Sequence, residues 1–247
     1  MTRNSVMLAA ALLAVPAVSR ADRRYYGETY NAATAPPGSL DVELWGTWYE
    51  PPKATPGAPG SWRYQLELET GITERWDIAA YGVVRQVAGA DPEFEAVKLE
   101  SRYALAAPGS WFVDPVIYVE LQKTFLDDKP FSVEEKLILA KDLGRLNVSL
   151  NGAAEQEVAG GDVEPEDSWA LGSSWELVPA FRLGAEIFGD RAKVASAAGG
   201  EQWQSQAWAG PAVSLAYGRS WLVLAAGWGL NDQSDELRIR GVLAFQF

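Results

Sequence analysis

Apolar and polar residues alternate along most of the chain after residue 38, with the period of two that is typical of β-strands. The alternation is clearest at the C-terminus, in residues 237–247. One side of this segment carries Arg238, Arg240 and Gln246. The other side carries Leu237, Ile239, Gly241, Leu243, Phe245 and Phe247. The segment therefore predicts a strand with one lipid-like face and one charged face.

Twelve segments carry this pattern and are predicted to be strands. They are residues 39–50, 62–72, 76–85, 96–105, 113–123, 132–141, 145–156, 169–177, 181–189, 207–217, 221–230 and 237–247. Segments 207–217 and 221–230 are apolar on both faces, so the pattern leaves their inward face open.

The strand pattern suits a membrane barrel. In lipid every backbone polar group must be paired, and a closed sheet achieves this with apolar side chains outside and polar ones inside. A terminal Phe is common in such barrels, although an edge strand of a soluble sandwich can also end in one. We therefore expect an all-β fold, a single transmembrane antiparallel up-and-down β-barrel of about 12 strands in a bacterial outer membrane.

The connections between these segments alternate in length. The longer ones are residues 51–61, 86–95, 124–131, 157–168, 190–206 and 231–236, and the shorter ones are residues 73–75, 106–110, 142–144, 178–180 and 218–220. Outer-membrane barrels have short periplasmic turns and longer outer loops. The alternation therefore favours a barrel over a sandwich and predicts both chain ends on the periplasmic side.

Tryptophan and loop acids add to this picture. Amphipathic rings prefer the membrane interface, so tryptophans near strand starts predict aromatic girdles. These are Trp62, Trp76, Trp111, Trp169, Trp208 and Trp221. Acids gather in two predicted outer loops, as Glu157, Asp162, Glu164, Glu166 and Asp167 and as Asp232, Asp235 and Glu236. We expect these carboxylates to be solvated or bridged by cations near lipopolysaccharide, or to concentrate cationic solutes at the mouth.

The N-terminus has the pattern of a secretory signal. Arg3 precedes an apolar run at residues 6–15, and Ser19 and Ala21 are small residues at positions −3 and −1 of a cleavage site. We therefore expect a signal peptide at residues 1–21, a periplasmic arm at residues 22–38 and the barrel at residues 39–247. Two states of the arm remain open, disorder in the periplasm and entry into the lumen as a plug.

Composition limits the chemistry. The chain has no histidine and no cysteine, and its formal net charge is −12. Without imidazole, Ser–His and Asp–His hydrolysis is excluded, and with it most enzymes of this scaffold. Disulfides and thiolate or histidine metal sites are excluded as well, and nucleic acid is an unsuitable partner. We expect no enzyme activity, no cofactor and no metal.

Inward-facing charges predict a polar lumen. They are Glu43, Glu67, Glu69, Lys98, Glu100, Arg102, Glu120, Arg182, Glu186, Arg238 and Arg240. Glu67 and Glu69 lie about 7 Å apart on one face, which suits two-carboxylate hydrolysis but is better explained by ion pairs with Lys98, Arg102 or Arg63. At barrel closure we expect Arg238 and Arg240 to lie beside Asp41 and Glu43.

These observations predict passive passage of a small solute through a narrow charged lumen, because twelve strands lie between filled eight-stranded barrels and wide porins. Apolar inward positions in residues 207–230 could instead form a path for hydrophobic solutes. The alternative is a closed structural or adhesive barrel whose acidic loops act outside. Expected partners are outer-membrane lipid, lipopolysaccharide and the barrel assembly machinery, which would recognise the last strand through Phe245 and Phe247.

The hairpin at residues 65–78, QLELETGITERWDI, resembles one in outer-membrane transporter barrels of the phenol-degradation MetA-pathway group, distant relatives of FadL-type channels for hydrophobic solutes. In that group a G-(I/L)-T-(D/E)-R turn joins an acidic strand to the next. The resemblance implies a transporter barrel. This chain is shorter and has compact outer loops, so no plug domain and no substrate-binding residues are carried over.

Overall fold

The computed structural model of the protein describes residues 23–126, 130–158, 166–195 and 200–247. They form twelve strands: β1 (Leu40–Tyr49), β2 (Ser61–Thr73), β3 (Trp76–Val87), β4 (Glu93–Ala104), β5 (Asp114–Thr124), β6 (Phe131–Leu143), β7 (Leu146–Val158), β8 (Glu166–Val178), β9 (Phe181–Ala195), β10 (Glu201–Tyr217), β11 (Ser220–Gly229) and β12 (Leu237–Gln246). The predicted signal peptide, residues 1–21, lies outside the described residues. Across the described ranges, no helix is long and apolar enough to cross a membrane.

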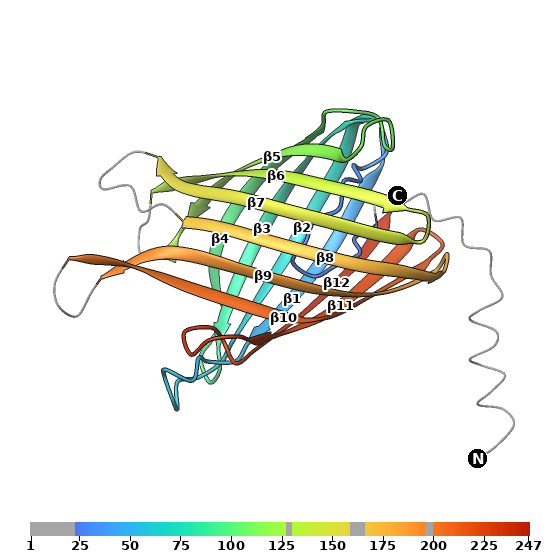
Figure 1. Ribbon diagram of the computed structural model, residues 1–247. Helices are drawn as coiled ribbons and strands as arrows, with labels where there is room; N and C mark the ends of the chain where they lie inside the picture. The colour runs from blue at the N-terminus through green and yellow to red at the C-terminus, as the bar shows by residue number, and fades with distance from the viewer. Residues whose placement is uncertain (1–22, 127–129, 159–165, 196–199) are drawn as a thin grey trace, which may run out of the picture.

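The strands follow one another around a closed barrel in chain order, each antiparallel to its neighbours (Figure 1). β1 pairs with β12 and closes the sheet. A closed sheet has no edge strand, so backbone groups are paired all the way round. The predicted all-β up-and-down barrel is confirmed.

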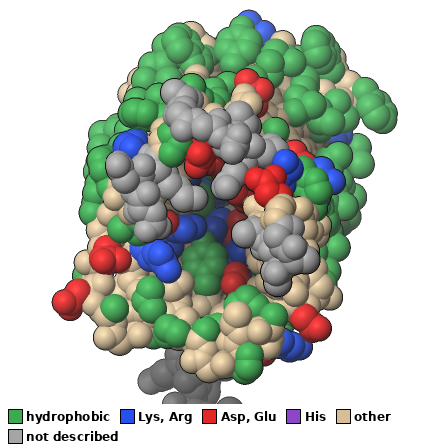
Figure 2. Space-filling model, turned by 90° about the vertical axis from the view of Figure 1, so that its left-hand side faces the viewer, with side chains coloured by type: hydrophobic (Ala, Val, Ile, Leu, Met, Phe, Trp, Pro, Cys, Tyr) green, Lys and Arg blue, Asp and Glu red, His purple; other side chains and the backbone are tan. Residues whose placement is uncertain are grey.

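The two faces of the sheet are inverted relative to a soluble protein. In β2, Leu66 and Leu68 are 48% and 47% exposed on the outside, while Glu67 and Glu69 are 2% and 3% exposed on the inside. Apolar side chains cover the flank of the molecule in Figure 2. An apolar exterior around a charged interior suits a barrel surrounded by lipid.

The two ends of the barrel differ in their connections. One end carries turns at residues 74–75, 144–145, 179–180 and 218–219 together with both ends of the barrel domain, and we call it the short-turn end. The other, the long-loop end, carries the described connections at residues 50–60, 88–92 and 230–236. The alternation is not strict, because residues 105–113 at the short-turn end exceed residues 88–92 in length. The rule for outer-membrane barrels predicts a periplasmic position for the short-turn end.

β9 and β10 run further towards the long-loop end than predicted. Their pairing continues to Ala195 and Glu201, whereas the sequence predicts a loop over residues 190–206 (Figure 1). The side chains here are mostly polar on both faces, so the alternation stops although the hydrogen-bond ladder continues. β8 likewise begins at Glu166. Several acids assigned to outer loops therefore lie in strands, namely Glu157 in β7 and Glu166 and Asp167 in β8, while Asp162 and Glu164 lie outside the described residues.

The closing register differs from the prediction. Arg240 pairs with Thr47 and Arg238 pairs with Tyr49, so neither arginine lies beside Asp41 or Glu43. The reason is that antiparallel closure brings both ends of the barrel domain to one end of the sheet. The start of β1 therefore meets the end of β12, where Asp41 pairs with Gln246.

The girdle prediction is correct for some tryptophans and wrong for two. Trp62, Trp76, Trp111 and Trp169 are exposed, as expected. Trp208 and Trp221 are 0% and 2% exposed and point inward. Trp208 stacks on Phe188, with ring centroids 5.4 Å apart, and donates to the Asp235 carbonyl at 3.1 Å. β10 and β11 are apolar on both faces, so alternation alone could not assign these rings.

Candidate functional site

Residues 23–35 lie inside the barrel, the second of the two alternatives for residues 22–38. Arg23 Nε donates to Ser214 Oγ at 2.8 Å, and Tyr26 Oη donates to Asn147 Oδ1 at 2.8 Å. The Ala35 amide donates to Asp77 Oδ2 at 2.9 Å. We call residues 23–35 the internal arm. Apart from an isolated bridge between Pro37 and Gly71, side chains rather than strand pairing hold this region to the wall.

The Glu186 carboxylate is the main anchor of the internal arm. It accepts hydrogen bonds from the consecutive amides of Gly27, Glu28 and Thr29 at 2.9, 2.9 and 3.0 Å. The Thr29 hydroxyl donates to the same carboxylate at 3.1 Å. Glu186 is buried, and hydrogen bonds to an ionised acceptor are roughly twice as strong as neutral ones. A single lumen carboxylate therefore fixes a whole turn of the arm.

Glycines in the wall leave space for the internal arm. An ideal Cβ on Gly172 would lie 2.8 Å from the Tyr26 ring, and one on Gly71 would clash with the Ala35 carbonyl oxygen. Two apolar inward positions, Ala212 of β10 and Ala225 of β11, also pack around Tyr26 of the arm. The arm therefore covers part of the apolar path considered for hydrophobic solutes.

Arg24 lies between two aromatic rings, 3.8 Å above the Tyr30 centroid and 4.5 Å from that of Trp45. Burial alone lowers its pKa, but neighbouring groups, Glu43 and Glu67 among them, outweigh this effect and raise the pKa above the ordinary value. Burial also raises the pKa of the Tyr30 phenol. Arg24 therefore stays charged and Tyr30 stays neutral, which holds this pair as a cation on an aromatic face.

A dense ion network lies in the wall beside the arm. Arg102 pairs with Glu69, with Asp77 at 2.8 Å and with Glu100 at 3.3 Å. The expected pairing of Glu69 with Arg102 is therefore present. Glu67 instead accepts hydrogen bonds from Trp45 at 3.0 Å and from Tyr81 at 2.7 Å.

Three of these acids come close enough to consider a cation site. The carboxylate oxygens of Glu43, Glu67 and Glu69 lie within 4.8 Å of one another. Trp45 donates to both Glu43 and Glu67, and Arg102 pairs with Glu69. These donors account for the buried carboxylates without a metal ion.

Between the internal arm and the long-loop end lies a cavity of about 630 Å³, which we call the upper cavity. Arg24, Glu28 and Tyr30 of the arm form its floor. Figure 2 looks into this end of the molecule and shows a hollow bordered by basic and acidic side chains, with apolar ones inside it. Its volume lies in the range of small-molecule sites.

The structure divides the predicted lumen residues into two groups. One group lines the upper cavity and consists of Lys98, Glu120, Arg238 and Arg240. The other does not line it and is buried in the contacts of the wall and the arm, as Glu43, Glu67, Glu69, Glu100, Arg102, Arg182 and Glu186. Arg182 pairs with Glu176 at 2.9 Å and lies 4.1 Å from the Tyr25 ring centroid.

The sequence prediction missed the floor of the cavity. Glu28 pairs with Arg240 at 2.6 Å and with Arg238 at 3.7 Å, so the arm is joined to β12. Arg63 and Glu95 form a two-fold ion pair at 2.8 and 2.7 Å near the mouth. The basic and aromatic composition of residues 23–30 was the available signal, because such side chains are unusual in a plain linker.

A closed twelve-stranded barrel with an apolar exterior and a charged interior defines an outer-membrane β-barrel. No protein-family model matches the chain, and no curated protein matches it. Solved structures share the fold. An outer-membrane channel from Pseudomonas putida F1 superposes with a TM-score of 0.62 at 12% identity, covering 87% of this chain and 98% of the other.

Two porins are also similar. The NanC porin superposes with a TM-score of 0.57 at 12% identity and covers 83% of this chain and 98% of its own. The KdgM porin, solved in complex with disordered oligogalacturonate, gives a TM-score of 0.53 at 8% identity and covers 85% and 98%. At these identities the comparisons establish the barrel fold.

Proposed function

We propose that this protein is an outer-membrane channel that lets a small solute pass through a narrow charged lumen. The observation that carries the proposal is the upper cavity, which is lined by charged side chains and lies at the long-loop end of the barrel. A barrel that served only as a scaffold would fill this volume with packed side chains, as eight-stranded barrels do.

The internal arm is the constriction in this proposal. It forms the floor of the cavity, and the cavity lining includes no residue of the short turns. Because the arm is held by side-chain contacts rather than by strand pairing, it can shift without opening the barrel wall. Passage would require such a shift, so the arm acts as a gate.

Two further features support a channel. The hairpin at residues 65–78 resembles transporter barrels of the MetA-pathway group, and the three similar structures are a channel and two porins.

We extend the proposal to assembly: the barrel assembly machinery would recognise Phe245 and Phe247 in the terminal strand. Replacing Phe247 with Ala is expected to lower the amount of folded barrel in the outer membrane.

A second candidate is a closed structural or adhesive barrel. The observation that favours it is the filled lumen near the short turns. The internal arm occupies this stretch, and the charged groups of Arg102 and Glu186 there are held in ion pairs and hydrogen bonds.

Single-channel recording separates the two functions. Residues 22–247 are refolded and inserted into a planar bilayer, alongside the arm variant Glu186→Ala and the control Glu135→Ala, whose side chain is exposed on β6.

A channel predicts discrete conductance steps in the original protein, with larger or more frequent steps in Glu186→Ala and no change in Glu135→Ala. Correctly folded barrels of all three proteins that carry no current would refute the channel and leave the closed barrel.

A further inference from the structure

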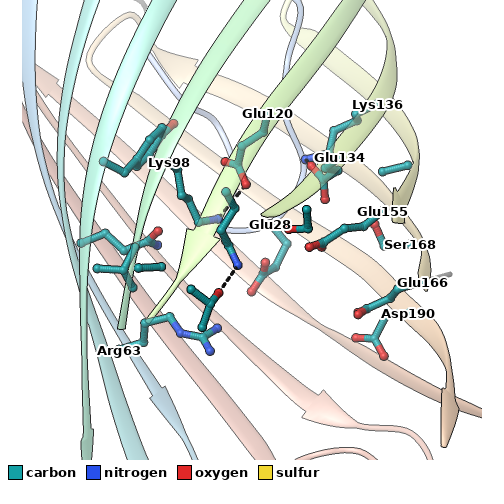
Figure 3. A pocket seen from close by; sticks show the side chains of 18 of the residues that line it. Glu28, Arg63, Lys98, Glu120, Glu134, Lys136, Glu155, Glu166, Ser168 and Asp190 are labelled. Carbon is teal, nitrogen blue, oxygen red and sulfur yellow. Dashed lines mark hydrogen bonds and ion pairs between the residues drawn. The ribbon is translucent and has the colours of Figure 1, made fainter. Parts of the chain in front are cut away.

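One half of the upper cavity is basic. Strands β12, β1, β2, β3 and β4 are consecutive around the barrel. Their charged side chains in the cavity lining are the bases Arg63, Arg85, Lys98, Arg238 and Arg240, with Glu95 as the acid. We call this half the basic wall. Figure 3 shows Arg63 and Lys98 pointing into the cavity from this side.

The opposite half is acidic. Strands β5 to β9 place Glu120, Glu134, Glu155, Glu157, Glu166 and Asp190 in the lining, with the bases Lys136 and Lys193. We call this half the acidic wall. In Figure 3, Glu155, Glu166 and Asp190 lie across the cavity from Arg63 and Lys98.

The acidic wall contains a continuous row of carboxylates. Glu120 pairs in register with Glu134, Glu134 with Glu155, and Glu155 with Glu166. Directly opposed like charges destabilise a sheet. The opposed carboxylates on these four neighbouring strands therefore lower the stability of the sheet. Such a local cost to stability is expected at functional sites.

Local pairing cancels only part of this row. Lys98 reaches Glu120 at 2.9 Å, and Lys136 reaches Glu134 at 2.8 Å. Among the residues that the structure describes, Glu155 and Glu157 have no hydrogen-bond or ion-pair partner. Glu155 and Glu157 thus present negative charge to the cavity.

On the basic wall, Arg63 pairs with Glu95, and both arginines of β12 pair with Glu28. Arg85 of the basic wall has no hydrogen-bond or ion-pair partner among the described residues, so it is the cation that remains available to a solute.

We propose that the upper cavity selects small zwitterionic solutes that carry an ammonium group and a carboxylate at separate ends. This inference rests on the proposed channel function. Opposed charged walls create a field across the cavity, and the low-dielectric barrel focuses it. A zwitterion aligns with its carboxylate towards the basic wall and its ammonium towards Glu155 and Glu157, whereas a solute with one sign of charge is repelled by one wall.

A matched series of five-carbon solutes tests the proposal: 5-aminopentanoate, glutarate, 1,5-diaminopentane and 1,5-pentanediol. Initial uptake into proteoliposomes is measured by mass spectrometry for the original protein, for Glu186→Ala, for Glu155→Gln with Glu157→Gln, and for the control Glu135→Gln. Glu135 lies on β6 beside Glu134 but faces outward, so the control removes an equal charge without touching the lining.

We expect 5-aminopentanoate to enter at least three times faster than the neutral diol and faster than either ion. The double variant should lose this preference, and Glu135→Gln should keep it. Equal rates for zwitterion and diol, or a preference that survives in the double variant, would overturn the selectivity while leaving the channel intact. A different outcome would refute the channel itself. Proteoliposomes with the original protein and with Glu186→Ala would then take up all four solutes, the diol included, no faster than protein-free liposomes. In that case the selectivity fails together with the channel function.

Discussion

The anchoring role of Glu186 can be tested quantitatively through the substitution Glu186→Ala. The change removes the acceptor of three consecutive arm amides at 2.9 to 3.0 Å. A hydrogen bond to a charged group contributes about 1.5–3 kcal/mol, and a buried donor left unpaired costs about 1–3 kcal/mol. Because these contributions are not additive and water can reach a loosened arm, we expect arm docking to weaken by about 3–6 kcal/mol.

The direct readout is hydrogen–deuterium exchange of the amides of Gly27, Glu28 and Thr29 in the folded barrel. At about 1.4 kcal/mol per factor of ten, the expected weakening lowers their protection by roughly 10²- to 10⁴-fold. Strand amides should keep their protection, since the barrel wall is unaffected. Glu157→Ala is the control, because Glu157 lines the same lumen and carries the same charge without contacting the arm.

Protection of the three amides that is unchanged in Glu186→Ala would refute the reasoning, since it would mean that packing alone holds the internal arm. A fall in protection without any rise in conductance would leave the anchor in place but contradict the gate.

Three further substitutions probe other parts of the molecule. Arg102→Leu leaves several buried carboxylates without their cation, and breaking a buried ion pair costs about 3–5 kcal/mol. The urea midpoint of unfolding should therefore fall, and an unchanged midpoint would show that the ion network is dispensable. Gly172→Val places a branched side chain where the Tyr26 ring lies, so arm amides should exchange faster while the heat-modifiable gel mobility of the barrel persists. Arg238→Glu reverses a charge in the cavity lining and should shift the reversal potential towards cation selectivity. Glu67 is buried outside that lining, so Glu67→Lys should instead lower the yield of folded barrel.

The strand pattern was predictable because two solvents act on the sheet. Lipid selects apolar side chains on one face, and the lumen selects polar ones on the other, so a strand such as β2 alternates without interruption. Where lipid ends, this selection ends too. That is why the sequence pattern predicts loops for the outer parts of β9 and β10 although their backbone pairing continues.

The arm and the closing register were not predictable from local pattern. Gly27 and Glu186 are 159 residues apart, and no periodicity connects an amide to a carboxylate at that separation. The signal that existed was indirect. β10 and β11 are apolar on both faces because their inward side chains pack against Tyr26 and one another rather than facing water. A doubly apolar strand in a barrel thus indicates a filled stretch of lumen.

The lumen is therefore built in two parts with different physical rules. Around the internal arm its groups follow the rules of a protein core: Arg102 and Glu186 are buried and fully engaged, and removing either should reduce stability or arm docking. In the upper cavity Glu155 and Glu157 have no partner among the described residues, so neutralising them should cost no stability, and neutralising Glu155 should relieve repulsion along the carboxylate row. Folding and selectivity should then separate cleanly by position along the barrel axis. The proposed selectivity therefore predicts that the urea midpoint of the Glu155→Gln, Glu157→Gln variant equals or exceeds that of the original protein.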